Sequence, residues 1–135
     1  SWLHPTGYGT LGYGLPAGIG AKFGAPTRPG LVLVGDGGFL YTAQELATAV
    51  EELDSPLVVL LWNNDALGQI RDDMLGLDIE PIGVLPRNPD FAALGRAFGC
   101  TVTQPQSLAE LQTDLRHGFK RNGVTLIELK HACAH

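Results

Sequence analysis

The chain has 135 residues, of which 44% are apolar and 17% charged, a composition typical of a globular domain and not of a disordered segment. The formal net charge is −5 and no basic run is present, which argues against a nucleic-acid partner. The longest apolar stretch, residues 56–62, is far shorter than the roughly 20 residues that span a bilayer, so we expect no membrane partner.

Two cysteines, Cys100 and Cys133, form neither a disulfide framework nor a CxxC motif, and we expect free thiols in a reducing compartment, the cytoplasm. The first residues lack the basic start and apolar run of a signal peptide. His131, Cys133 and His135 could be soft-metal ligands, but without a second ligand pair a frayed terminal tail is the preferred interpretation.

The first third of the chain contains a glycine-rich segment, a helix and a strand. Six glycines lie between Gly7 and Gly20, and the small residues of 15–23 predict a tightly packed helix. Residues 31–34 form an unbroken aliphatic run, which predicts a strand buried on both faces, as in a parallel sheet. This strand ends in the motif Gly-Asp-Gly-Gly at positions 35–38.

Residues 42–53 have helical spacing, with Thr42 as the expected N-cap and Glu45 completing a capping box. A second buried strand, residues 57–62, follows and ends in Asn63, Asn64 and Asp65; we expect Trp62 in the core. The expected apolar face of the helix consists of Ala43, Leu46, Ala47, Val50 and Leu53.

The second half repeats this alternation of helices and strands. We expect a short helix over 66–74, a loop over 76–89, helices over 91–98 and 108–119 with Asp90 and Ser107 as N-caps, and strands over 101–103 and 124–129. Strands that alternate with helices predict an α/β fold: one domain, a three-layer sandwich with a mostly parallel central sheet and helices on both faces.

Polar residues follow two of the predicted strands, where open parallel sheets bind ligands. The Asp36 carboxylate and an asparagine amide oxygen, together with phosphate oxygens, are a hard oxygen set that suits Mg²⁺. Gly37 and Gly38 permit close approach of an anion to the backbone. The motifs therefore indicate a Mg²⁺-bridged phosphate site; the alternative is that Asp36 is a turn residue and the asparagines a plain loop.

Residues 7–12 also match G-x-G-x-x-G, the fingerprint of dinucleotide-binding domains. That fingerprint must follow a strand, and residues 1–6 do not form a convincing one, so the dinucleotide-binding interpretation is disfavoured.

Three ordered motifs carry a family resemblance: the segment GYGTLGYGLPAGIGA at 7–21, GDGGF at 35–39 with TAQELATAV at 42–50, and the asparagine pair at 63–64. Together they resemble the C-terminal, diphosphate-binding domain of thiamine-diphosphate-dependent enzymes of the acetolactate synthase and 2-oxoacid decarboxylase type. The family hallmark is GDG followed after about 25–30 residues by NN, and Asp36 and Asn64 are 28 positions apart.

The resemblance implies thiamine diphosphate and Mg²⁺ as cofactors, with Asp36, Asn64 and the main-chain carbonyl of Ala66 as metal ligands. Because the 51–56 loop is one residue longer than in many relatives, Asn63 is the alternative to Asn64, which is favoured by the register of Gly68. Leu11 would prop the cofactor in its bent shape. The full set of implied cofactor-binding residues is Gly9, Thr10, Leu11, Asp36, Gly37, Gly38, Asn64, Ala66, Leu67 and Gly68.

In the family, the activating glutamate belongs to a pyrimidine-binding domain of the neighbouring subunit. The resemblance therefore implies that residues 1–135 are the C-terminal domain alone, lacking its first elements, that the pyrimidine-binding and central domains are absent, and that no catalytic residue lies in this chain. Alone it should not turn over substrate. A homodimer or homotetramer is expected of the full-length protein, which would act on a small 2-oxoacid.

For the substrate, the run WNND-x-x-G-x-IRD at 62–72 and PIGV at 81–84 look like 5-guanidino-2-oxopentanoate decarboxylases. Asp72 or Asp73 could accept a cationic tail, although a solvated helix face explains both residues equally well. The alternatives are an acetolactate-synthase-like enzyme acting on pyruvate and a non-catalytic relative that keeps the fold for assembly or regulation.

Overall fold

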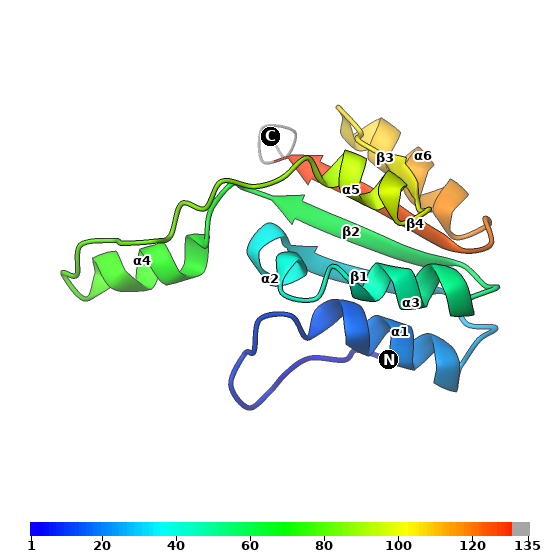
Figure 1. Cartoon of the computed structure of the whole chain (residues 1–135), viewed down its shortest axis with the longest axis horizontal. Helices are drawn as coiled ribbons and strands as arrows, with labels where there is room; N and C mark the ends of the chain where they lie inside the picture. Colours follow the sequence, from blue (N-terminus) through cyan, green and yellow to red (C-terminus); the bar gives the residue numbers. More distant parts are fainter. Residues whose placement is uncertain (131–135) are drawn as a thin grey trace.

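The computed structural model describes residues 1–130 and has the predicted alternation of helices and strands (Figure 1). His131, Cys133 and His135 lie outside the described residues. In chain order the elements are α1 (Gly14–Gly24), β1 (Gly30–Gly35), α2 (Asp36–Leu40), α3 (Glu45–Glu52), β2 (Leu57–Asn63), α4 (Gly68–Gly76), α5 (Phe91–Ala97), β3 (Thr101–Thr103), α6 (Leu108–Gly118) and β4 (Val124–Lys130).

The four strands form one sheet in the order β1-β2-β4-β3, and every pair is parallel. Aliphatic runs form β2 and β4, which occupy the centre and are buried along almost their whole length. Parallel pairing brings the carboxyl ends of β1, β2 and β4 to the same edge, with Gly35 opposite Trp62 and Asn63 opposite Lys130. The structure confirms the predicted α/β class with a parallel central sheet.

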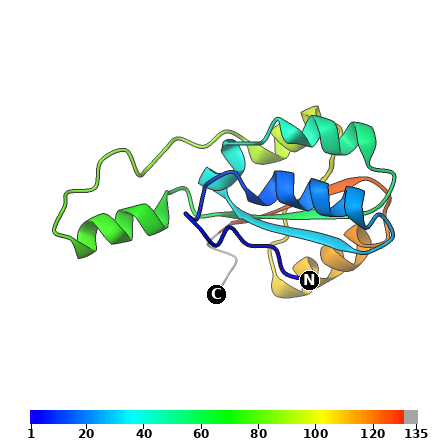
Figure 2. The same cartoon turned by 90° about the horizontal axis from the view of Figure 1, so that it is seen from below.

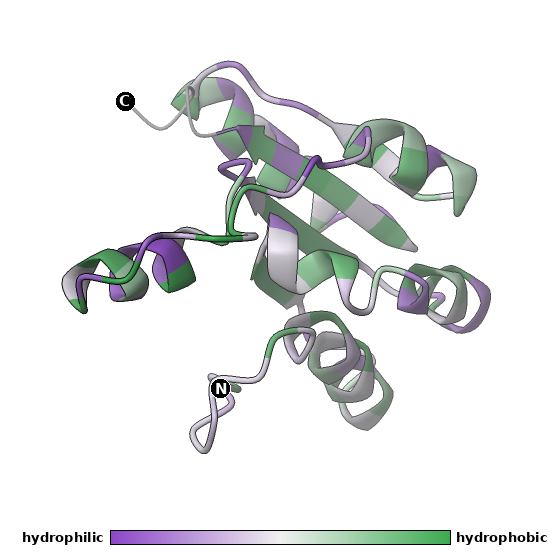
Figure 3. Cartoon of the chain, turned by 60° about the vertical axis from the view of Figure 1, so that its left-hand side comes forward, coloured by the Kyte–Doolittle hydropathy of each residue, from purple (hydrophilic) through white to green (hydrophobic). Residues whose placement is uncertain are grey.

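The main core lies between one face of the sheet and helices α1, α3 and α5 (Figure 2). Phe39 and Phe91 meet edge to face there, with their ring centroids 5.8 Å apart. Cys100 is a buried free thiol in this core, as expected, and burial raises its pKa to about 11. Apolar residues are concentrated on the central strands (Figure 3).

The opposite face is covered by α6, which packs on β2 and β4, so that helices lie on both faces as predicted (Figure 2). This cover does not extend to β1, where Leu31 and Leu33 are 52% and 55% exposed. The expected burial of β1 on both faces is therefore wrong, because β1 is an edge strand beyond the reach of α6. Trp62 lies on the same face of the sheet and is 37% exposed, so its expected core position is also wrong.

The helix predicted over 42–53 begins later, at Glu45, because α2 starts directly after β1 and a turn links the two helices. The Thr42 hydroxyl makes no capping bond; instead it donates to the Gly12 carbonyl oxygen at 2.9 Å, which pins the glycine-rich segment to this turn. The predicted apolar face is partly wrong, because Ala47 and Val50 are exposed while Ala49 is fully buried.

The predicted caps of the later helices are confirmed. The Asp90 carboxylate accepts from Ala93 N at 2.8 Å at the start of α5, and the Ser107 hydroxyl accepts from Glu110 N at 3.2 Å at the start of α6. The short helix expected over 66–74 is α4, at Gly68–Gly76.

Helix α4 projects from the body of the molecule, and residues 77–90 return from its far end to α5 (Figures 1 and 2). None of its residues is buried. Within residues 1–130, no helix has the length and apolar character needed to cross a membrane.

Candidate functional site

Polar residues converge at the carboxyl edge of the sheet, as the sequence predicts. Asp36 is the first residue of α2 and Asn63 the last residue of β2, and their exposed fractions are only 2% and 5%. A buried carboxylate and a buried amide at a sheet edge need polar partners, since isolated burial of either group is costly. Those partners come from the 77–90 segment, from the loop after β2 and from β4.

Asn88 links these groups. Its Nδ2 donates to Asp36 Oδ2 at 2.6 Å, and it lies 3.2 Å from both Asn63 Oδ1 and Asp65 Oδ1. One amide nitrogen carries two hydrogens, so three acceptor oxygens around it cannot all be fully satisfied. Two carboxylates and an amide oxygen around one point form an oxygen-rich environment of the kind that hard divalent cations prefer.

Glu128 fixes the orientation of Asn63 from the other side. The Glu128 carboxylate is 3% exposed; it accepts from Asn63 Nδ2 at 2.7 Å and from Gln104 Nε2 at 2.6 Å. The amide nitrogen of Asn63 thus faces Glu128, and Asn63 Oδ1 faces Asn88 and the backbone N–H of Asp65. These residues line a polar pocket of about 360 Å³.

The two asparagines of the pair have different environments. Asn64 is exposed, and its Oδ1 accepts from Ala66 N at 3.3 Å, which holds the loop in a local turn. Its Nδ2 would lie only 2.9 Å from a Cβ at position 68, so Gly68 leaves room for the Asn64 side chain. Asn63 shares a hydrogen-bonding partner with Asp36, whereas Asn64 is bonded within its own loop. The assignment of Asn64 and of the carbonyl of buried Ala66 as metal ligands stays a prediction.

The glycine motifs and the loop after β2 come together around the start of α2. A Cβ at position 37 would collide with the Leu67 side chain, and a Cβ at position 38 would lie 3.7 Å from Leu11. The structure thus brings Leu11, Leu67 and the Gly37–Gly38 backbone side by side. Gly9 and Thr10 are exposed in the glycine-rich segment, and Gly9 has a φ of +59°. Whether these residues bind a cofactor stays a prediction.

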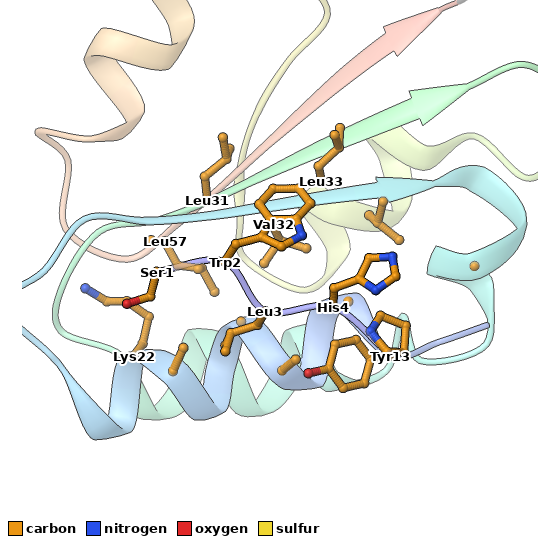
Figure 4. Close-up of a pocket in the computed structure, with 18 of the residues that line it drawn as sticks. Ser1, Trp2, Leu3, His4, Tyr13, Lys22, Leu31, Val32, Leu33 and Leu57 are labelled. Carbon is orange, nitrogen blue, oxygen red and sulfur yellow. The ribbon is translucent and has the colours of Figure 1, made fainter. Parts of the chain in front are cut away.

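A larger cavity, of about 650 Å³, lies between α1, the uncovered face of β1 and the N-terminal segment (Figure 4). Trp2, Leu31, Leu33 and Val32 give it an apolar lining. It includes Thr10, Leu11 and Gly38 from the predicted cofactor set but none of the Asp36, Asn63 and Asn88 cluster. The smaller polar pocket is lined by Asn63, Asp65 and Asn88 of that cluster, although not by Asp36.

The family can now be assigned. Residues 1–129 match the profile described as "thiamine pyrophosphate enzyme, C-terminal TPP binding domain". The chain belongs to this family. Thiamine diphosphate is the family's cofactor and Mg²⁺ its usual partner metal, which agrees with the cofactors that the sequence motifs imply.

Similar proteins support this assignment. The chain is 87% identical over 134 residues to a Pseudomonas aeruginosa protein named "probable 2-ketoarginine decarboxylase", covering 99% of this chain and 24% of that protein. It is 33% identical over 132 residues to a "probable acetolactate synthase large subunit" of Methanocaldococcus jannaschii, covering 96% and 22%. A solved thiamine-diphosphate-dependent 4-hydroxybenzoylformate decarboxylase of Rhodococcus jostii superposes with a TM-score of 0.85 at 29% identity, covering 93% and 24%.

The residues around Asp36 offer the oxygen donors that Mg²⁺ prefers, while the predicted ligand set of Asp36, Asn64 and the Ala66 carbonyl stays a prediction. Within residues 1–130 no group of three or more histidine, cysteine, aspartate or glutamate side chains could hold a metal. The ligand set that the motifs imply combines Asp36 with amide and main-chain oxygens instead. Asp36 supplies a carboxylate, of which Asn88 takes only Oδ2, and the loop after β2 supplies amide and main-chain oxygens.

Three residues of the cluster were missed by sequence reasoning: Asn88, Gln104 and Glu128. Glu128 had a signal, because a charged residue interrupts a mainly aliphatic strand, β4. Asn88 had a weaker one, as the residue before the Pro89–Asp90 helix start. Gln104 had none, since a glutamine after a short strand is ordinary loop composition.

Proposed function

We propose that this chain is the diphosphate- and Mg²⁺-binding domain of a thiamine-diphosphate-dependent 2-oxoacid decarboxylase, and that its substrate is 5-guanidino-2-oxopentanoate. The observation that carries the proposal is the 87% identity, over nearly the whole chain, to the protein named "probable 2-ketoarginine decarboxylase". 2-Ketoarginine and 5-guanidino-2-oxopentanoate are the same compound. The chain spans about a quarter of the length of that relative, so the reaction is assigned to the full-length protein and not to these residues alone.

In this proposal Asp36, Asn64 and the Ala66 carbonyl hold Mg²⁺, with Asn63 as the alternative to Asn64. Gly37 and Gly38 would offer their backbone amides to the diphosphate, and Leu11, beside Gly38, would support the cofactor from the glycine-rich segment. When bound, thiamine diphosphate supplies the electron sink for loss of carbon dioxide. The chain's own residues bind and orient the cofactor. The remaining contacts are assigned to Gly9, Thr10, Leu67 and Gly68.

The proposal also includes the parts of the protein outside this chain. We assign residues 1–135 to a single C-terminal domain, and the activating glutamate to a pyrimidine-binding domain of a neighbouring subunit in a homodimer or homotetramer. Support comes from the relatives, of which this chain covers only 22–24%. A cytoplasmic location remains a prediction from the cysteine content.

A role for Asp72 or Asp73 in holding the guanidinium tail stays a hypothesis. Both lie on the projecting helix α4 and have local partners: Asp72 pairs with Arg71 at 2.9 Å, and Asp73 accepts from Gln69 Nε2 at 2.8 Å. Asp72 is 63% exposed, where such pairs contribute little stability, so these local partners would not prevent Asp72 from binding a cationic ligand.

The substrate is tested by steady-state kinetics of the full-length protein with thiamine diphosphate and Mg²⁺. The proposal expects kcat/KM for 5-guanidino-2-oxopentanoate to exceed that for pyruvate, measured as carbon dioxide release. A higher kcat/KM for pyruvate would favour the second candidate, an acetolactate-synthase-like enzyme. The 33% identity to the archaeal relative supports this candidate. Measuring acetolactate formation from pyruvate separates carboligation from simple decarboxylation.

The metal assignment is tested by the Asp36→Ala variant of the full-length protein. Removing the buried carboxylate should abolish the Mg²⁺-dependent part of thiamine diphosphate binding in calorimetric titrations. Asp54→Ala, at an exposed position before β2, is the matched control and should bind like the wild type. Equal Mg²⁺ dependence in the Asp36 variant and the control would contradict the proposed metal site.

A further inference from the structure

Asn88 is the side chain through which the 77–90 segment contacts the predicted metal ligand Asp36. Its 2.6 Å bond to Asp36 Oδ2 is the shortest of its three contacts, and it joins residues 52 positions apart in the chain. We propose that Asn88 is a positioning residue that holds the Asp36 carboxylate in the orientation needed to bind Mg²⁺. This inference deepens the proposed function and rests on it.

The two oxygens of the Asp36 carboxylate have different roles in this proposal. Asn88 takes Oδ2, so Oδ1 is the oxygen left for a cation. When one oxygen of a carboxylate accepts a hydrogen bond from a fixed donor, the carboxylate cannot rotate freely. Its second oxygen, here Oδ1, then has a fixed orientation toward a bound cation. Asp36 is almost fully buried, so losing this donor costs more than it would at the surface.

The donor itself is held on a rigid support. Pro89 restricts the backbone of Asn88 to extended conformations, and Asp90, one residue further, caps α5. The same segment is attached upstream, where Leu67 N donates to the carbonyl of buried Val84 at 2.8 Å. Asn88 therefore reaches Asp36 from a segment anchored at both ends, which is what positioning a ligand requires.

The Oδ1 atom of Asn88 makes no hydrogen bond within residues 1–130, so a substitution can test the Nδ2 donor alone. This oxygen is buried and has no hydrogen-bonding partner among the described residues. Leucine has a shape similar to that of asparagine. Replacing Asn88 by leucine therefore removes the hydrogen bonds that Nδ2 donates, and Oδ1 accepts none from the described part of the chain that could be lost. Burying an unpaired oxygen is unfavourable, and leucine carries no such oxygen. The Asn88→Leu variant should therefore regain part of the stability that is lost with the Nδ2 hydrogen bonds.

The test measures metal affinity directly, in the full-length protein saturated with thiamine diphosphate. Mn²⁺ serves as the probe, because free Mn²⁺ is quantified by electron paramagnetic resonance. Asn88→Ala and Asn88→Leu should each raise the Kd for Mn²⁺ by about 10–100-fold, the loss typical of removing a residue that orients a metal ligand. Asn122→Ala, at an exposed turn asparagine, is the matched control and should leave the Kd unchanged.

The outcomes separate the two proposals. If the wild type binds Mn²⁺ but both Asn88 variants, folded by circular dichroism, bind it equally or more tightly, the positioning role is overturned while the proposed function stands. If the wild type itself binds no Mn²⁺ with thiamine diphosphate present, the proposed function fails and this inference with it. A lowered Tm with an unchanged Kd indicates a purely structural role and likewise overturns the inference.

Discussion

Glu128 is a buried carboxylate whose pairing can be followed atom by atom. Each of its oxygens accepts one amide hydrogen, from Asn63 and Gln104, at 2.7 and 2.6 Å. A fully paired buried polar group rigidifies its surroundings, whereas a half-paired one is costly. At the scale of single residues, Glu128 thus decides which end of the Asn63 amide faces Asn88.

Glu128→Gln should lower the free energy of unfolding by about 1–3 kcal/mol, because glutamine offers one acceptor oxygen and turns an N–H toward a second donor. Urea denaturation gives the comparison, and Glu51→Gln, at an exposed helix position, is the control expected to change little. Equal stability of the two variants would mean that the two bonds of Glu128 contribute nothing net.

At the scale of elements, the small residues of helix α1 allow it to pack closely on β1. A Cβ at position 18 would collide with the Val32 side chain of β1, whereas a Cβ at position 20 would meet no atom within 4 Å. Gly18 therefore sets the close approach of α1 to β1, while Gly20, on the exposed side of the same helix, has no such packing role. Sequence spacing predicted tight packing but not which glycine was responsible.

The two glycines provide a matched pair for measurement. Gly18→Ala should destabilise the chain by about 1–3 kcal/mol through overpacking against Val32. Gly20→Ala should stabilise it by about 0.5–1 kcal/mol, because alanine restricts the unfolded chain and favours the helix. Thermal or urea unfolding of both variants tests this, and effects of the same sign would contradict the packing described for α1.

The whole molecule is asymmetric across its sheet. Helices α1, α3 and α5 cover one face, while on the other face α6 covers β2 and β4 and leaves β1 open. In β1, the neighbouring residues Val32 and Leu33 are 4% and 55% exposed. Burial therefore alternates along this strand, although every residue of the 31–34 run is aliphatic. The asymmetry is a property of the arrangement of layers and is not visible in the strand itself.

Leucine truncations measure this asymmetry in the 135-residue chain. Leu61→Ala, at a fully buried site of β2, should cost about 2–5 kcal/mol, the range for deleting a buried leucine side chain. Leu33→Ala should cost within about 0.5 kcal/mol, because its side chain is mostly in water. Equal losses, measured by urea denaturation, would show that the outer face of β1 is covered after all.

Much of the fold and part of the site could be predicted from local patterns. Apart from α2, which was not predicted, the order of elements, the parallel sheet and the caps at Asp90 and Ser107 follow from periodicity and capping chemistry, which act over a few residues. The Thr42 cap failed because a contact with Gly12, 30 positions away, replaced it. Asn88 was missed for the same reason, since its partner lies 52 positions away.

By itself, the amino-acid sequence determined the α/β class, the family and the edge of the sheet where the polar motifs meet, because aliphatic runs, helix starts and motif spacing are local properties. Only the tertiary structure decided that Asn63 and Asn88 are bonded around Asp36, that Glu128 orients Asn63, and that the outer face of β1 is open. These three features depend on which distant side chains and layers pack together. Such long-range contacts produce no periodic pattern in the sequence of a strand or loop, so the sequence alone does not reveal them.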